Sequence, residues 1–264
     1  MRLRKLFYLP SDILGKVSGN TDDPIPPQGD IYIGSGDFRK QGLHQATLLQ
    51  ELAGLQAGSR VLDVGSGIGR TALPLTAVLL PEKGGMYEGF DVVPKGVDWC
   101  RANITSRHPH FDFRLVSLGN NLYNEIKTDA AEFVFPYEAG RFDIAFMFSV
   151  FTHLQPDVID NYLREISRVL TPGGRCLTTM FLIDEQLPMT NAAFQFRHDF
   201  GDYRLMDEKV TDANVAISKD WLLGKIRAAG LELTAAHNGY WRTGANDGKA
   251  KDFQDVVLLH KPIA

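Results

Sequence analysis

The stretch RVLDVGSGIGR, residues 60–70, decides the fold class of this chain. Its first part, 60–64, is an apolar and β-branched run that predicts a short buried strand. Gly65, Gly67 and Gly69 follow at alternate positions, where glycine lets the backbone turn sharply and lets a ligand approach without meeting a Cβ atom. A helix is expected over 70–80, so the stretch is interpreted as strand, glycine loop and helix.

Strands and helices alternate along the rest of the chain. The run 142–148 is nearly all apolar, as in a strand that is covered on both faces. This alternation predicts βαβ units and a mostly parallel sheet, which binds ligands beyond the carboxyl ends of its strands. The expected strands are 60–64, 85–90, 111–116, 142–148, 175–183, 231–236 and 253–260, and the expected helices are 41–55, 70–80, 95–106, 157–170 and 219–229.

An acid stands at the end of the next strand. Asp91 follows the glycine loop by about 20 residues, the spacing at which an acid reaches a ribose diol. An ionised aspartate only accepts hydrogen bonds, which suits two adjacent hydroxyl groups. The combination favours a nucleoside site over a purely structural turn between strand and helix.

The spacing of the glycines indicates which nucleoside binds. Dinucleotide sites use G-x-G-x-x-G, whereas here Arg70 occupies the place of the last glycine. Asp63 lies two residues before the first glycine, where it can hold the loop or face a cationic ligand. An acid at that position suits S-adenosylmethionine (SAM), with its sulfonium and ammonium groups, better than a pyrophosphate. The loop therefore favours SAM over NAD.

With these features the sequence resembles the class I, Rossmann-like SAM-dependent methyltransferases, in particular bacterial members that modify small molecules and glycans. The resemblance is strongest over residues 31–183. The run DVGSGIG (63–69) matches the first motif of the family, and EGFD (88–91) matches the second. The fourth strand, entered through FDI (142–144), ends at SVFTHL (149–154), and LTPGGR (170–175) matches the loop before the fifth strand.

The resemblance implies an α/β fold with a seven-stranded, mostly parallel sheet flanked by helices, in which the last strand (253–260) is antiparallel. It also implies SAM as the cofactor, Asp91 on the ribose hydroxyls, and an N-terminal segment (32–38) that can close over the cofactor. The cofactor-binding residues expected on this basis are Asp63, Gly65, Ser66, Gly67, Gly69, Asp91, Val92, Ser117, Leu118 and Ser149.

One position departs from the family pattern. After the third strand the family usually has an acid that binds the adenine amino group, but this chain has Ser117 and Leu118. The serine hydroxyl can still accept a hydrogen bond, and the backbone of Leu118 can meet the ring. Asn120 or Asn121 is the alternative partner for the adenine.

His153 is the candidate for proton handling among the seven histidines. It follows the fourth strand, beside the expected methyl group, and imidazole titrates in the useful pH range. The alternative is a structural histidine that caps the loop. His198 and His237 are weaker candidates, because they are only expected on the ligand side of the sheet.

The insertion 184–217 is placed to cap the site, and it is rich in aromatic residues. Aromatic walls with a few polar groups are typical of a pocket for a small molecule or sugar, although a satellite hydrophobic cluster or a dimer surface is the alternative. No metal site is expected, because the fourth strand ends at a serine rather than an acid. The expected substrate-binding residues are His198, Tyr203, Tyr240 and Trp241.

The composition of the 264 residues is that of an ordinary globular protein, with 44% hydrophobic and 23% charged residues. A net charge of −4 gives no sign of affinity for nucleic acid, and no apolar run is long enough to span a bilayer. Cys100 and Cys176 lack metal-ligand spacing, which favours a reducing, cytoplasmic compartment. We expect an N-terminal arm or lid at 1–40 and one methyltransferase domain at 41–264.

The sequence therefore predicts an enzyme that transfers the methyl group of SAM to a hydroxyl of a small molecule or saccharide, with an amine as the second choice of acceptor. Two rival functions stay open at this point. One is an NAD-dependent oxidoreductase, which the glycine spacing disfavours. The other is a non-catalytic SAM-binding protein, since a fold alone does not give a function. The oligomeric state is left open.

Overall fold

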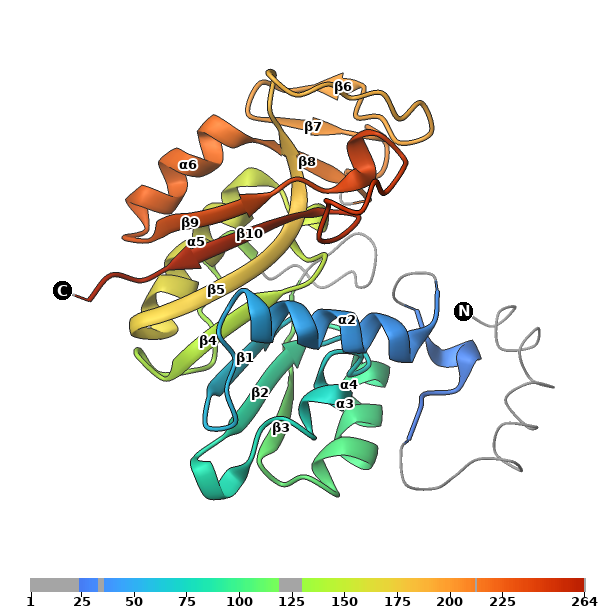
Figure 1. Cartoon of the computed structure of the whole chain (residues 1–264). Coiled ribbons are helices and arrows are strands. Elements are labelled where there is room, and N and C mark those ends of the chain that lie inside the picture. Colours follow the sequence, from blue (N-terminus) through green and yellow to red (C-terminus); the bar gives the residue numbers. More distant parts are fainter. Residues whose placement is uncertain (1–23, 33–35, 119–129, 212, 264) are drawn as a thin grey trace.

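One sheet of ten strands forms the centre of the computed structural model, which describes residues 24–32, 36–118, 130–211 and 213–263 (Figure 1). Seven strands follow the order β3-β2-β1-β4-β5-β10-β9. The strands are β1 (Arg60–Val64), β2 (Met86–Asp91), β3 (Phe111–Leu115), β4 (Phe142–Met147), β5 (Leu170–Ile183), β6 (His198–Asp199), β7 (Tyr203–Leu205), β8 (Val215–Ser218), β9 (Glu232–His237) and β10 (Asp255–His260).

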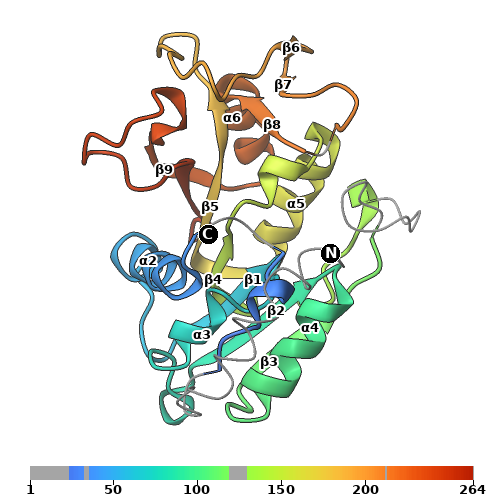
Figure 2. The same cartoon turned by 90° about the vertical axis from the view of Figure 1, so that its right-hand side faces the viewer.

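The seven-stranded arrangement confirms the predicted fold. Strands β1 to β5 pair in parallel, and β10 runs antiparallel to both β5 and β9. Three short strands are additional: β8 pairs with the last residues of β5, and β7 and β6 follow it outward. These strands lie within 198–218, in and directly after the predicted insertion 184–217, at the opposite end of the molecule from β3 (Figures 1 and 2).

Helices cover both faces of the sheet (Figure 1). On one face, α2 and α4 pack with α3 over a cluster of buried residues that includes Leu49, Val61 and Phe146. On the other face, α5 and α6 pack over a cluster that includes Leu62 and Met147. Because neighbours along β1 point to opposite faces, Val61 and Leu62 enter different clusters. The helices are α2 (Phe38–Glu51), α3 (Ala72–Leu75), α4 (Pro94–Cys100), α5 (Pro156–Val169) and α6 (Lys219–Ala228).

Helix α3 is much shorter than the helix predicted over 70–80. Pro74 has no N–H to donate to the carbonyl of Arg70, which weakens the first turn. That carbonyl is also closely approached by α2, since a Cβ atom on Gly42 would lie 2.4 Å from its oxygen. The chain after α3 continues in tight turns, with Thr76 and Val78 donating to carbonyls three residues earlier.

Helix α2 begins at Phe38, three residues before the predicted start of the domain at 41. The Asp37 side chain accepts a hydrogen bond from the backbone N–H of Lys40 at 2.9 Å and so caps the helix. The helix predicted over 41–55 therefore begins earlier than expected. Residues 1–23 and 33–35 of the predicted arm 1–40 lie outside the described part. Within the described residues, none of the helices is long and apolar enough to cross a membrane.

Candidate active site

The glycine loop joins β1 to α3 in a conformation that only glycine adopts easily. Gly65, Gly67 and Gly69 have φ angles of 82°, 58° and 78°, in the left-handed region. The lack of side chains also permits close packing, since a Cβ atom on Gly65 would lie 2.6 Å from Val150 at the end of β4. A Cβ atom on Gly69 would lie 2.9 Å from the sulfur of Cys100. The loop is therefore held between β4 and α4.

Asp91 ends β2, and its carboxylate joins the glycine loop to the start of the chain segment after β2. Its Oδ2 accepts from the backbone N–H of Gly67 at 2.7 Å, and its Oδ1 accepts from that of Val93 at 2.8 Å. Burial raises the pKa of Asp91, and these backbone N–H groups oppose the rise. Each oxygen still has a lone pair for a further donor. Asp91 therefore offers two acceptors to a ligand beside the loop.

Asp63 lies in the middle of the sheet, opposite Gly89 of β2 and Phe146 of β4. It is buried and accepts a hydrogen bond from the hydroxyl of Tyr87. The pKa of Asp63 is raised to about 8, because an ionised carboxylate would lose its hydration at this buried position. The hydrogen bond from Tyr87 opposes this rise. Without a ligand, this carboxyl group is therefore largely protonated at neutral pH.

The raised pKa of Asp63 makes a prediction about stability. Between the ordinary value of 3.8 and about 8, the folded state holds a proton that the unfolded state has released, so stability falls as the pH rises through this window. Asp63→Asn can still accept from Tyr87 but has no charge to bury. We expect the melting temperature of this variant to exceed that of the parent by a margin that grows from about pH 5 to about pH 8. A margin that stays constant over this range contradicts the assigned pKa.

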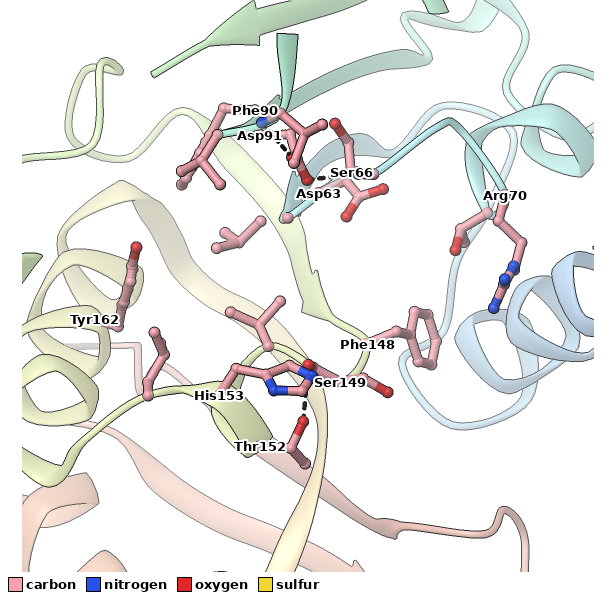
Figure 3. Close-up of a pocket in the computed structure, with 18 of the residues that line it drawn as sticks. Asp63, Ser66, Arg70, Phe90, Asp91, Phe148, Ser149, Thr152, His153 and Tyr162 are labelled. Atoms are coloured by element: carbon pink, nitrogen blue, oxygen red, sulfur yellow. Dashed lines mark hydrogen bonds between the residues drawn. The ribbon is translucent and has the colours of Figure 1, made fainter. Parts of the chain in front are cut away.

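A cavity of about 350 Å³ opens at the carboxyl ends of β1, β2 and β4. Figure 3 shows Asp63, Ser66 and Asp91 on one side of it and Ser149 and His153 on the opposite side. The sequence-predicted residues that line the cavity are Asp63, Gly65, Ser66, Gly67, Asp91, Val92, Leu118, Ser149 and His153.

The end of β4 forms the floor opposite the glycine loop. Ser149 is the non-glycine residue with positive φ, at 60°, in the described part of the chain. Its backbone N–H donates to Oγ1 of Thr179 on β5 at 2.8 Å, and its carbonyl accepts from Thr152 at 2.9 Å. This turn leads into a single 3₁₀ turn, Phe151–His153, which places the half-buried His153 at the cavity.

Residues 62–178 match the family model described as a methyltransferase domain. The matched segment contains the glycine loop, Asp91 and the end of β4, which are the parts that build the cavity. Over this segment the chain is similar to methyltransferase domains. The rest of the cavity is formed by residues on either side of this segment, including Tyr32 and Gln254.

Two curated relatives of this chain are named as methyltransferases. The chain is 31% identical over 158 residues to 27-O-demethylrifamycin SV methyltransferase of Amycolatopsis mediterranei, an alignment that covers 58% of this chain and 52% of the relative. It is 30% identical over 128 residues to methyltransferase GfsG of Streptomyces halstedii, covering 48% of this chain and 39% of the relative. The chain thus spans about half, or less, of the length of these relatives.

A solved structure supports the fold of the chain. The 1,6-didemethyltoxoflavin-N1-methyltransferase of Burkholderia thailandensis, which was solved with 1,6-didemethyltoxoflavin and S-adenosylhomocysteine, aligns with a TM-score of 0.52. The alignment covers 98% of this chain and 87% of that protein, at 20% sequence identity. At this identity the likeness establishes the fold alone.

Two expected cofactor residues, Ser117 and Gly69, do not line the cavity. Ser117 is exposed and does not line it, whereas the neighbouring Leu118 is buried and does. Gly69 packs against α4 and the turn after it instead of facing the cavity. The alternative adenine partners, Asn120 and Asn121, lie outside the described residues.

The expected aromatic wall of the substrate pocket is corrected by the structure. Trp241 is fully buried and donates its Nε1 hydrogen to Asp255 at 2.8 Å, within a cluster that also contains Phe181 and Phe196. This is the satellite hydrophobic cluster that the sequence left as the alternative. The other expected substrate residues also lie outside the cavity lining. His198 pairs with Glu208 at 3.3 Å, Tyr203 stacks on Phe200 with ring centroids 4.9 Å apart, and Tyr240 contacts Phe253 at 5.2 Å between centroids.

Several cavity residues were not expected from the sequence. Arg70, directly after the glycine loop, lines the cavity, and burial lowers its pKa to about 10, so that it stays cationic at neutral pH. Gln45 of α2 also lines it and accepts from the hydroxyl of Thr71 at 2.7 Å. The position of Arg70 beside the loop was a signal that could have been used. The other unexpected residues include Phe148, Asn214 and Gln254, whereas Tyr32 belongs to the segment 32–38 that was expected to close over the cofactor.

Proposed function

We propose that this chain is a SAM-dependent methyltransferase that transfers a methyl group to a hydroxyl of a small molecule or saccharide. The observation that carries the proposal is the shared cavity, in which the glycine loop with Asp91 faces the β4 end with His153. The methyltransferase-domain match and the names of the two curated relatives support the reaction class.

The residues present fit the cofactor. The Oγ of Ser66 is buried and has no hydrogen-bond partner among the described residues, and it lies in the loop that lines the cavity. A buried hydroxyl of this kind calls for a polar ligand. Asp91 would accept from the two ribose hydroxyls, and the apolar Val92 and Leu118 would flank the adenine. S-adenosylhomocysteine bound to the Burkholderia thailandensis neighbour is consistent with this cofactor class.

The amino-acid end of SAM would lie near the start of α3. Asp63 suits the ammonium group, whose charge favours the ionised carboxylate, and Arg70 suits the carboxylate. The acidic Asp63 and the basic Arg70, both at the glycine loop, match the ammonium and carboxylate groups of this amino-acid end. A dinucleotide pyrophosphate would instead meet two carboxyl groups, Asp63 and Asp91, in the same cavity. The oxidoreductase alternative is therefore disfavoured again.

The reaction needs little beyond alignment and the removal of one proton. When bound, SAM supplies a methyl group on a sulfonium, so a new acceptor O–CH₃ bond forms as the C–S bond breaks. The residues of the chain hold the two reactants in line, which is the main source of acceleration in such a displacement. His153, whose side chain lies at the cavity, would accept the proton that the acceptor hydroxyl loses.

The two segments outside the matched domain would border the reactants. Tyr32 reaches the cavity from the N-terminal side, where Asp30 forms an ion pair with Lys95 of α4. Asn214 reaches it from the insertion 184–217. We therefore assign a covering role to Tyr32 and Asn214. A cytoplasmic location belongs to the same proposal, because Cys100 and Cys176 are buried thiols that form no disulfide.

Methyl transfer itself tests the proposal. The purified chain is incubated with SAM carrying a tritiated methyl group and with separate pools of hydroxylated and amine-bearing small molecules. We expect label in products of the hydroxylated pool, a gain of one methyl group by mass spectrometry, and formation of S-adenosylhomocysteine. Binding of S-adenosylhomocysteine without transfer to either pool would favour the non-catalytic alternative. Transfer confined to the amine pool would overturn the choice of oxygen.

A further inference from the structure

The cavity has two ends, which follow from the strand order. The glycine loop and Asp91 come from the ends of β1 and β2, on one side of β4. Gln254 precedes β10 and Asn214 precedes β8, and both of these strands lie beyond β4, next to β5. If the cofactor occupies the first end, the second end is left for the methyl acceptor.

Gln254 is held in one orientation at this second end. The hydroxyl of Ser149 donates to Oε1 of Gln254 at 3.0 Å, which occupies the amide oxygen. Among the described residues, no partner is found for the amide nitrogen Nε2. The amide therefore presents two N–H donors at the cavity. A ligand oxygen can accept hydrogen bonds from these donors.

The backbone on both sides of this contact is fixed. Ser149 keeps its left-handed φ of 60° through the bonds to Thr179 and Thr152, and such strain is found at functional sites that the surroundings over-determine. The backbone N–H of Gln254 donates to Asp252 at 3.4 Å, and Asp252 in turn contacts Nε2 of His44 on α2 at 2.9 Å. Gln254 is thus positioned before a ligand arrives.

We propose that Gln254 binds the methyl acceptor and that this acceptor is a neutral, oxygen-rich molecule. The polar side chains at the second end are the uncharged Ser149, Thr152, Asn214 and Gln254, together with His153. Phe148 and Leu154 supply apolar surface. A charged acceptor would lose its hydration there without gaining an opposite charge. The Nε2 donors of Gln254 would instead bind a carbonyl, ether or hydroxyl oxygen close to the hydroxyl that is methylated.

The charged residues of the lining reinforce this assignment. Asp63 and Asp91 lie on the glycine-loop side of the cavity, across from Ser149 and His153 (Figure 3). Arg70 directly follows the same loop, where its positive charge suits the carboxylate of the cofactor. The inference rests on the proposed function, because it takes the first end to be the SAM site.

The test uses an isosteric change at Gln254. Gln254→Glu keeps an oxygen for the Ser149 hydroxyl but removes the N–H donors and adds a negative charge. The matched control is Gln186→Glu, which makes the same change at an exposed position of the insertion. Parent and variants are titrated with S-adenosylhomocysteine, and are then assayed with tritiated SAM against neutral polyols, which include macrolactones and methyl glycosides, and against their carboxylate-bearing counterparts.

We expect the parent to methylate neutral acceptors in preference to the carboxylates. Gln254→Glu should raise the KM for the neutral acceptor at least tenfold, with little change in the KM for SAM or in affinity for S-adenosylhomocysteine, and Gln186→Glu should behave as the parent. A parent that prefers carboxylates, or that methylates neither class while binding S-adenosylhomocysteine, overturns the inference. So does a Gln254→Glu variant with an unchanged acceptor KM. Loss of S-adenosylhomocysteine binding in the parent would instead contradict the proposed function.

Discussion

Asp91→Ala is expected to weaken the binding of S-adenosylhomocysteine by about 100-fold or more. The change would remove the two proposed charge-assisted hydrogen bonds to the ribose hydroxyls, each contributing about 1.5 kcal/mol or more. It also leaves the N–H groups of Gly67 and Val93 without their acceptor, so the loop loses its preorganised shape. Isothermal titration of the purified variant measures the loss.

The matched control for this prediction is Asp98→Ala. Asp98 is an exposed residue of α4, on the element that follows Asp91, and it does not line the cavity. The control should bind S-adenosylhomocysteine as the parent does. Asp91→Asn keeps the shape of the side chain and should lie between the parent and the alanine variant. An Asp91→Ala protein that is folded and binds with parental affinity would remove Asp91 from the cofactor site.

His153→Gln is expected to lower kcat by about 10² to 10⁴ while affinity for S-adenosylhomocysteine stays within a few-fold of the parent. Glutamine can form hydrogen bonds at the same place but cannot accept a proton at neutral pH. The loss should fall on the chemical step, because the side chain stands across the cavity from the residues that would hold the cofactor. Single-turnover methyl transfer measures this step.

His260→Gln is the matched control for the histidine prediction. His260 ends β10, lies outside the cavity lining and contacts Glu232 of β9 at 3.8 Å. Its replacement should leave kcat unchanged. If His153→Gln turns over as fast as the parent, the proton leaves to solvent or to another group, and His153 has only the structural role that the sequence left as its alternative.

The sequence was sufficient to predict the parts of the fold that depend on local patterns. The strand 60–64 coincides with β1, and the strand 253–260 contains the antiparallel β10, because short apolar runs between glycine and charged residues have few other structures available. The helix predicted over 70–80 is too long, because the pattern of apolar residues does not show how the segment packs against the rest of the chain. The proximity of Gly42 to the carbonyl of Arg70 is a tertiary contact.

The candidate site was predictable only where its residues are close in sequence. Asp63, Ser66 and Asp91 were expected because the loop and the next strand form one βαβ unit. Gln254 was not, because it is 105 residues from Ser149, and only the pairing of β10 with β5 brings the two together. Trp241 was misassigned because aromatic composition predicts a buried surface but does not distinguish a core from a ligand pocket.

Calorimetric titration of the parent chain with S-adenosylhomocysteine and, separately, with NADH decides whether the cavity at the glycine loop binds SAM. We expect micromolar binding of S-adenosylhomocysteine and no binding of NADH. Tight binding of NADH that S-adenosylhomocysteine fails to displace, or no binding of either compound, would contradict this expectation.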